Sequence, residues 1–137
     1  MIKEDNEYSG LSKDVLVYIN PKSKFRDGFC LSWSHGLMIL SDMDLTASQY
    51  RILLLIIAEL EFENICYATQ SYITEKTGIS QPNVSKHIAV LVKRNLIFKE
   101  IIKGRRAFRV HCHIAWKGTK SKAFNMAFER DGHYVLE

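Results

Sequence analysis

Hydrophobic and polar residues recur along this chain with two different periods. From residue 29 the apolar side chains Phe29, Trp33, Leu37 and Leu40 fall at i, i+4, i+8 and i+11, which predicts a helix. A second helix is predicted over residues 50–60, which are apolar on nearly every side. Period-two alternation predicts strands at residues 96–102 and 123–129. Further short strands are predicted at residues 15–19, 64–68 and 106–111. The pattern therefore predicts an α+β fold.

Local signals mark where the predicted helices begin and end. Thr46 and Gln49 have the spacing of a capping box in front of the helix over residues 50–60. That helix is expected to lie either at the centre of the core or in a contact with a second subunit.

The segment 68–95 has the punctuation of two short helices joined by a tight turn. Thr69 is expected to cap a helix over residues 70–76, with Tyr72 and Ile73 facing inward. Gly78 would supply the left-handed turn, Ser80 the next cap, and Pro82 lies in the first turn of the second helix. This order predicts a helix-turn-helix over residues 69–95.

The second helix of this unit has two distinct faces on a helical wheel. Its core-facing residues are Val84, Ile88, Leu91 and Val92. Its outward residues are Pro82, Asn83, Lys86, Ala89, Val90 and Lys93. A face that is small, amide-bearing and basic suits approach to base edges and phosphates, although an exposed helix of an unrelated bundle would look similar. The residues expected to contact DNA are Ser80, Gln81, Asn83, Lys86, His87, Lys93 and Arg94.

A hairpin is predicted after this helix, over residues 96–111, with its turn at Gly104-Arg105. A hairpin in this place is the wing of a winged helix. Its tip carries Lys103, Arg105 and Arg106, which are expected to meet the DNA backbone or the minor groove. The alternative is that these cations only keep the hairpin edge soluble. The chain is thus predicted to form one winged-helix domain over residues 1–137, with residues 1–14 flexible and a basic loop over residues 22–28.

Charge is distributed unevenly along the 137 residues. The formal net charge is +4, yet residues 80–122 alone contain eleven Lys and Arg against one acid, Glu100. Positive charge is therefore concentrated in the stretch that begins with the predicted recognition helix. This favours a phosphate-binding surface over a merely solvated face.

Composition excludes several classes of protein. The longest apolar run, residues 52–58, is far too short to span a bilayer, and the polar N-terminus does not resemble a signal peptide. The three cysteines are odd in number and widely spaced, so a disulfide framework is not expected and a reduced cytoplasm is.

His111-Cys112-His113 is the one motif with catalytic potential. In a strand both imidazoles would share a face and hold a divalent metal, and a downstream Tyr134 would complete the pattern of a rolling-circle nicking enzyme. The motif lacks a further ligand, and the chain has no Walker loop, catalytic triad pattern or dinucleotide turn. We therefore expect no enzyme activity, no metal and no cofactor.

Residues 24–130 resemble the RepL-type plasmid replication proteins, which carry a winged helix. The resemblance rests on Thr69 to Leu91 with Asn95-Leu96-Ile97, and on four flanking motifs: Gly28-Phe29, Leu45-Thr46, Trp116-Lys117-Gly118 and Phe124 to Phe128. It implies a DNA-binding protein that acts at a plasmid origin and need not be an enzyme. The first hypothesis is therefore a replication protein that binds double-stranded origin DNA as a homodimer, with host replication proteins as partners. Three alternatives stay open: a transcriptional regulator of a plasmid or phage operon, a nickase, and a winged helix that binds only proteins.

Overall fold

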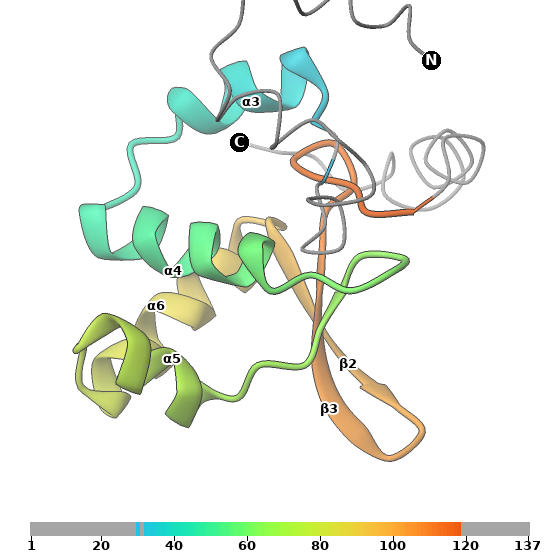
Figure 1. Cartoon of the computed structure of the whole chain (residues 1–137). Coiled ribbons are helices and arrows are strands. Elements are labelled where there is room, and N and C mark those ends of the chain that lie inside the picture. The colour runs from blue at the N-terminus through green and yellow to red at the C-terminus, as the bar shows by residue number, and fades with distance from the viewer. Residues whose placement is uncertain (1–29, 31, 119–137) are drawn as a thin grey trace, which may run out of the picture.

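The computed structural model describes residue 30 and residues 32–118 (Figure 1). The elements in chain order are α3 (Ser34–Ser41), α4 (Ala47–Ala58), β1 (Ile65–Cys66), α5 (Gln70–Thr77), α6 (Gln81–Lys93), β2 (Ile97–Ile102) and β3 (Arg105–Val110). The flexible segment, the basic loop and the two strands predicted at residues 1–14, 22–28, 15–19 and 123–129 lie outside the described residues.

Helix α4 begins at the predicted capping box, at Ala47 rather than residue 50, and ends at Ala58, two residues earlier than predicted. The Oγ1 atom of Thr46 accepts from the backbone N–H of Gln49 at 3.2 Å, and Oε1 of Gln49 accepts from the N–H of Thr46 at 3.0 Å. This capping box satisfies two of the amide donors that a helix start leaves unpaired. Its residues Ile52, Leu53 and Ile56 are fully buried, which confirms a central place in the core. Leu54 is 60% exposed, so the helix is not covered on every side.

Helix α5 is fixed at both ends. Thr69 accepts from the backbone N–H of Tyr72 at 3.1 Å, and Gly78 takes the predicted left-handed conformation with φ of 76°. Ile73 is buried as predicted, but Tyr72 lies only partly inside. The Tyr72 hydroxyl donates to Oε2 of Glu59, the C-cap residue of α4, at 2.6 Å. That hydrogen bond raises the pKa of Tyr72, because the carboxylate stabilises the protonated phenol.

The sheet is antiparallel with the strand order β1-β3-β2. Ile97 pairs with Val110 and Ile102 with Arg105, which leaves a two-residue turn of Lys103 and Gly104. Both turn residues have positive φ, 52° and 77°, the geometry that suits the twist of a two-residue hairpin. The turn therefore lies one residue earlier than predicted, and β1 is shorter than the predicted strand over residues 64–68.

Helix α3 departs most from its prediction. It begins at Ser34, with Trp33 at the N-cap position, rather than at Phe29. The helical spacing is right for Leu40, which is buried, but Leu37 is 47% exposed. The apolar spacing therefore identified the helix but not its first residue or its whole buried face.

The core lies where α4, α5 and α6 meet the root of the hairpin (Figure 1). Buried side chains from each of these elements form one cluster, among them Ile52, Ile73, Ile88, Ile97 and Val110. The tip of β2 and β3 projects past the helices, free of this core (Figure 1). Three helices with a hairpin directly after the third are a winged helix-turn-helix, which confirms the predicted fold. No helix in the described part of the chain is long and apolar enough to cross a membrane.

Candidate nucleic-acid interface

Helix α6 occupies the position of a recognition helix and divides into two faces as predicted. Val84, Ile88 and Leu91 are buried without any exposed surface. Five of the residues expected to contact DNA are exposed, namely Ser80, Gln81, Asn83, Lys86 and Lys93. Ser80 holds the N-cap position with extended backbone, but its side chain makes no capping hydrogen bond, contrary to expectation. Its hydroxyl is thus not committed to the helix start.

The other two residues expected on this face, His87 and Arg94, are half-buried. Nδ1 of His87 lies 3.3 Å from Nε2 of Gln49, and Nη2 of Arg94 donates to the carbonyl oxygen of Met43 at 3.1 Å. These residues are seven apart, so they lie on the same flank of α6. Both contacts lead to the segment around the start of α4. This flank is therefore anchored to the protein, whereas the rest of the outward face is free.

The three predicted wing cations are exposed but lie on different faces of the hairpin. Side chains alternate across a strand, so Arg106 shares a face with Phe108 and Val110, which point into the core. Arg105 lies on the opposite face, with its guanidinium 4.2 Å above the ring centre of Tyr67. Lys103 stands in the turn itself. Only Arg106 of these three faces the helices.

A groove of about 720 Å³ separates the wing from the helix-turn-helix. Residues from the start of α5, the start of α6 and the wing line it, including Gln70, Ser71, Gln81, Lys99 and Arg106. Two cations on one wall, with the amide-bearing start of α6 on the other, suit a nucleic-acid backbone.

Sequence reasoning missed Lys99, Gln70 and Ser71. The signal for Lys99 was present in the sequence, because residues two apart on a strand share a face and Lys99 lies between Ile97 and Ile101 on one face of β2. Gln70 and Ser71 have no comparable local signal, since only the packing of α5 against α6 brings them to the groove.

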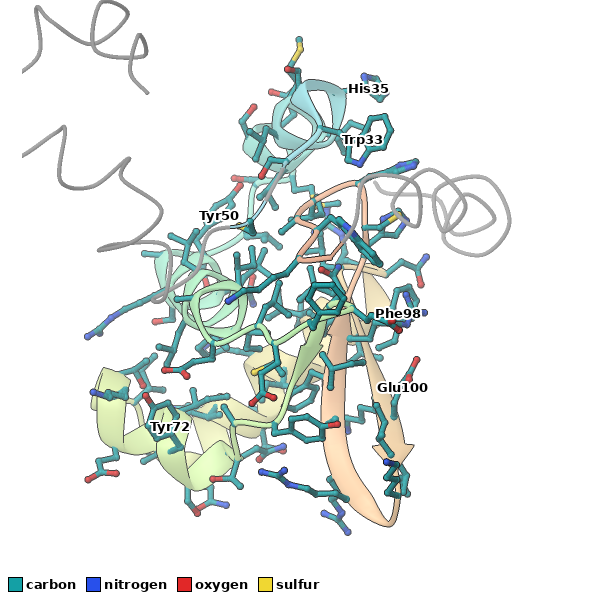
Figure 2. All side chains as sticks on the ribbon, turned by 45° about the vertical axis from the view of Figure 1, so that its right-hand side comes forward. Trp33, His35, Tyr50, Tyr72, Phe98 and Glu100 are labelled. Carbon is teal, nitrogen blue, oxygen red and sulfur yellow. The ribbon has the colours of Figure 1, made fainter. Side chains whose placement is uncertain are left out.

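The one acid of the basic stretch is neutralised locally. Nε of Arg109 donates to Oε2 of Glu100 at 2.8 Å, and the Arg109 guanidinium lies 4.3 Å above the ring centre of Phe98. Phe98 and Glu100 stand two residues apart on β2 and point to the same side of the hairpin (Figure 2). The ion pair with Glu100 neutralises the charge of the buried Arg109. The net positive charge of the wing therefore comes from its exposed cations.

His111-Cys112-His113 does not have the geometry of a strand motif. Strand β3 ends at Val110, and residues 112–114 form a turn in which the backbone N–H of His113 donates to Nδ1 of His111 at 3.1 Å. The expectation that both imidazoles share a strand face is therefore wrong. Among residue 30 and residues 32–118, no three His, Cys, Asp or Glu side chains are placed to hold a metal ion. Tyr134, the other half of the nickase hypothesis, lies outside the described residues.

The surroundings of this turn are structural. His111 is fully buried beside Phe98, and the ring of His113 lies 5.8 Å from that of Trp33. The turn thus joins the end of the wing to the start of α3 (Figure 2).

Comparison with known proteins gives one family-level similarity. Residues 43–107 match the model of the MarR family. The matched segment starts just before the capping box of α4 and ends within β3, so it contains α4, α5, α6 and most of the wing. The similarity supports sequence-specific DNA binding and transcriptional regulation. No curated protein matches the chain.

This similarity supports one part of the resemblance inferred from the sequence. Its winged-helix part is confirmed, but the match gives no support to a RepL-type replication protein in particular. Of the functions left open, transcriptional regulation fits the MarR-like segment better than replication does.

Proposed function

We propose that this protein is a transcriptional regulator that binds double-stranded DNA through α6 and the wing. The observation that carries the proposal is the groove between them, with Gln81 at the start of α6 facing Lys99 and Arg106 on the wing. Asn83 and Lys86 extend the same exposed side of α6 and are the candidates for contacts to base edges. The MarR-like segment spans both walls of this groove.

The phosphate contacts are assigned to the cations that the fold leaves exposed. The exposed members of the predicted set are Lys93 at the end of α6 and Lys103, Arg105 and Arg106 on the wing, to which Lys99 is added. Arg94, also predicted to hold a phosphate, is half-buried and donates to Met43 instead. A winged helix on a regulatory site commonly works as a homodimer on two half-sites, and we propose that arrangement here. Analytical ultracentrifugation with and without the selected DNA tests it, and a monomer in both conditions contradicts it.

Selection of bound fragments from a random duplex pool tests the function directly. We expect one recurring sequence that is located at a promoter in the source genome. This location distinguishes a regulator from an origin-binding replication protein. Recovery of the site at a replication origin instead favours replication. No enrichment over several rounds contradicts sequence-specific binding.

A pair of variants ties the binding to the proposed surface. Lys86→Ala removes a cation from the exposed face of α6, whereas Arg51→Ala removes one from the exposed side of α4. Arg51 is the matched control, because it lies away from the buried residues with which α4 meets α6. We expect about fivefold to a hundredfold weaker binding of the selected site by Lys86→Ala, the range for losing one good base contact. Equal effects of both variants in a gel-shift titration would show that the assignment to α6 is wrong.

A further inference from the structure

The side chain of Gln49 connects the start of α4 to the recognition helix. Its Oε1 atom accepts from the backbone N–H of Thr46 at 3.0 Å, and this hydrogen bond fixes which way the amide points. Its Nε2 atom, a donor only, then faces Nδ1 of His87 at 3.3 Å. Gln49 is buried, so the amide has little freedom to turn.

This orientation decides where His87 carries its proton. A neutral imidazole has one N–H and one bare nitrogen. Since Nδ1 faces a donor, Nδ1 must be the bare nitrogen, and the hydrogen of the neutral ring is on Nε2. Within the described part of the chain, Nε2 of His87 has no hydrogen-bond partner.

His87 lies beside the face of α6 that is proposed to contact DNA. His87 follows Asn83 by four residues on α6, so it borders the exposed face that carries Asn83 and Lys86. His87 is half-buried, so part of the residue is exposed to solvent. Arg94 on the same flank donates to the carbonyl oxygen of Met43, which ties this side of α6 to the segment before α4.

We propose that Gln49 is a positioning residue that presets His87 as an N–H donor for an acceptor atom of DNA. The inference rests on the proposed function and adds one donor, with its protonation state, to the recognition helix. The acceptor is a phosphate oxygen or an acceptor atom on a base edge, which both take an N–H donor. A ring already held in one tautomer and orientation loses less freedom when it binds.

The substitution Gln49→Glu isolates this relationship. Glutamate serves as well as glutamine at the third helical position of a capping box, so the start of α4 is kept. The donor facing His87 becomes an acceptor, which requires a hydrogen on Nδ1. His87→Ala and the double variant complete a cycle that separates the effect through His87 from the effect of the added negative charge.

Two measurements on the full chain test the proposal. Ring nitrogen chemical shifts of His87, recorded by NMR at a pH where the ring is neutral, report which nitrogen carries the hydrogen. Gel-shift titration on the selected DNA site reports affinity for the four proteins of the cycle. We expect the hydrogen on Nε2 in the parent and on Nδ1 in Gln49→Glu. Each single variant is expected to bind about threefold to tenfold more weakly, the value of one hydrogen bond.

In the cycle, Gln49→Glu is expected to add nothing once His87 is alanine. A hydrogen on Nδ1 in the parent overturns the proposal without any variant having to fold. An undiminished effect of Gln49→Glu in the His87→Ala background also overturns it, because charge alone then explains the loss. If His87→Ala binds the site as tightly as the parent does, only this inference is overturned. If the parent binds no duplex DNA, the proposed function and this inference are overturned together.

The selected site also distinguishes the two kinds of acceptor. If His87 donates to a base, His87→Ala relaxes the preference at one position of the site. If it donates to a phosphate, the variant weakens all sequences equally.

Discussion

Gly36 on α3 lies directly against the backbone of His113. A Cβ atom built on Gly36 would overlap the carbonyl group of His113, so the close approach of α3 to the turn after β3 requires a glycine here. The ring of Trp33 meets that of His113 at 5.8 Å beside the same contact. Glycine disfavours a helix interior, yet here it is the residue that lets the helix dock.

Gly36→Ala is therefore expected to destabilise the protein, against the usual trend for a helix. Alanine in a helix interior normally gains about 0.5–1 kcal/mol over glycine. Overpacking against a backbone that cannot move aside costs about 1–3 kcal/mol, so the net change in the free energy of unfolding should be a loss. Urea denaturation measures it, with the exposed Met38→Ala on the same helix as the control. A gain in stability for Gly36→Ala would show that α3 does not dock on this turn.

Asn64 joins β1 to the segment after β3. Its Nδ2 donates to the carbonyl oxygens of Val110 and Ala115 at 2.8 and 2.7 Å, and its Oδ1 accepts from the N–H of Lys117 at 2.7 Å. The residue is fully buried and has a positive φ of 68°. Asn64→Ala removes all three hydrogen bonds and leaves buried partners unpaired, which should cost about 2–4 kcal/mol of unfolding free energy.

Asn64→Gly is the matched variant, because glycine keeps the freedom to adopt positive φ. It should be more stable than Asn64→Ala by about 1 kcal/mol, the cost of the left-handed conformation for a residue with a Cβ. Denaturation of the two variants side by side measures this difference. Two variants as stable as the parent would mean that the network does not hold these segments together.

The elements that sequence predicted well are those defined by neighbours in the chain. The Thr46–Gln49 capping box, the Thr69 cap and the left-handed Gly78 each depend on residues at most three or four positions apart, and each is confirmed. The buried face of α6 follows from helical periodicity in the same way. Ser80 is the exception, because its position was right but its capping hydrogen bond is absent.

What sequence did not predict depends on contacts between distant residues. His87 and Gln49 are 38 positions apart, and Arg94 and Met43 are 51 apart. Nothing local therefore indicated that these two candidates for DNA contact are anchored to α4 and to the segment before it. The space that Gly36 leaves for His113 is equally remote in sequence. The prediction that His111 and His113 share a strand face fails because β3 ends before them. The end of β3 is set by its pairing with β1 and β2, which the alternation alone does not define.

Thiol reactivity should follow burial. Cys30 is exposed, whereas Cys66 and Cys112 are buried. Burial also raises the pKa of the Cys66 thiol, so this thiol forms less of the reactive thiolate near neutral pH. A thiol reagent at pH 8 is expected to modify Cys30 rapidly in the native protein and the other two only after denaturant is added. Mass mapping of the modified peptides checks this, and Cys30→Ser should abolish the fast phase. Fast native labelling of Cys66 would contradict the packing of β1.

The two neighbouring wing arginines should contribute unequally to DNA binding, because they lie on opposite faces of β3. Arg106 lines the groove facing α6, while Arg105 stacks on Tyr67. Each phosphate contact that is lost lowers the slope of log affinity against log salt by about 0.9. We expect Arg106→Ala to lower that slope by about one such contact and Arg105→Ala to lower it less.

Both variants remove one positive charge from adjacent, exposed positions, so each serves as the control for the other. Gel-shift titrations at several salt concentrations provide the comparison. A larger fall for Arg105→Ala would place DNA on the Tyr67 face of the wing instead of in the groove. Equal falls would mean that the hairpin tip as a whole, rather than its groove face, meets the backbone.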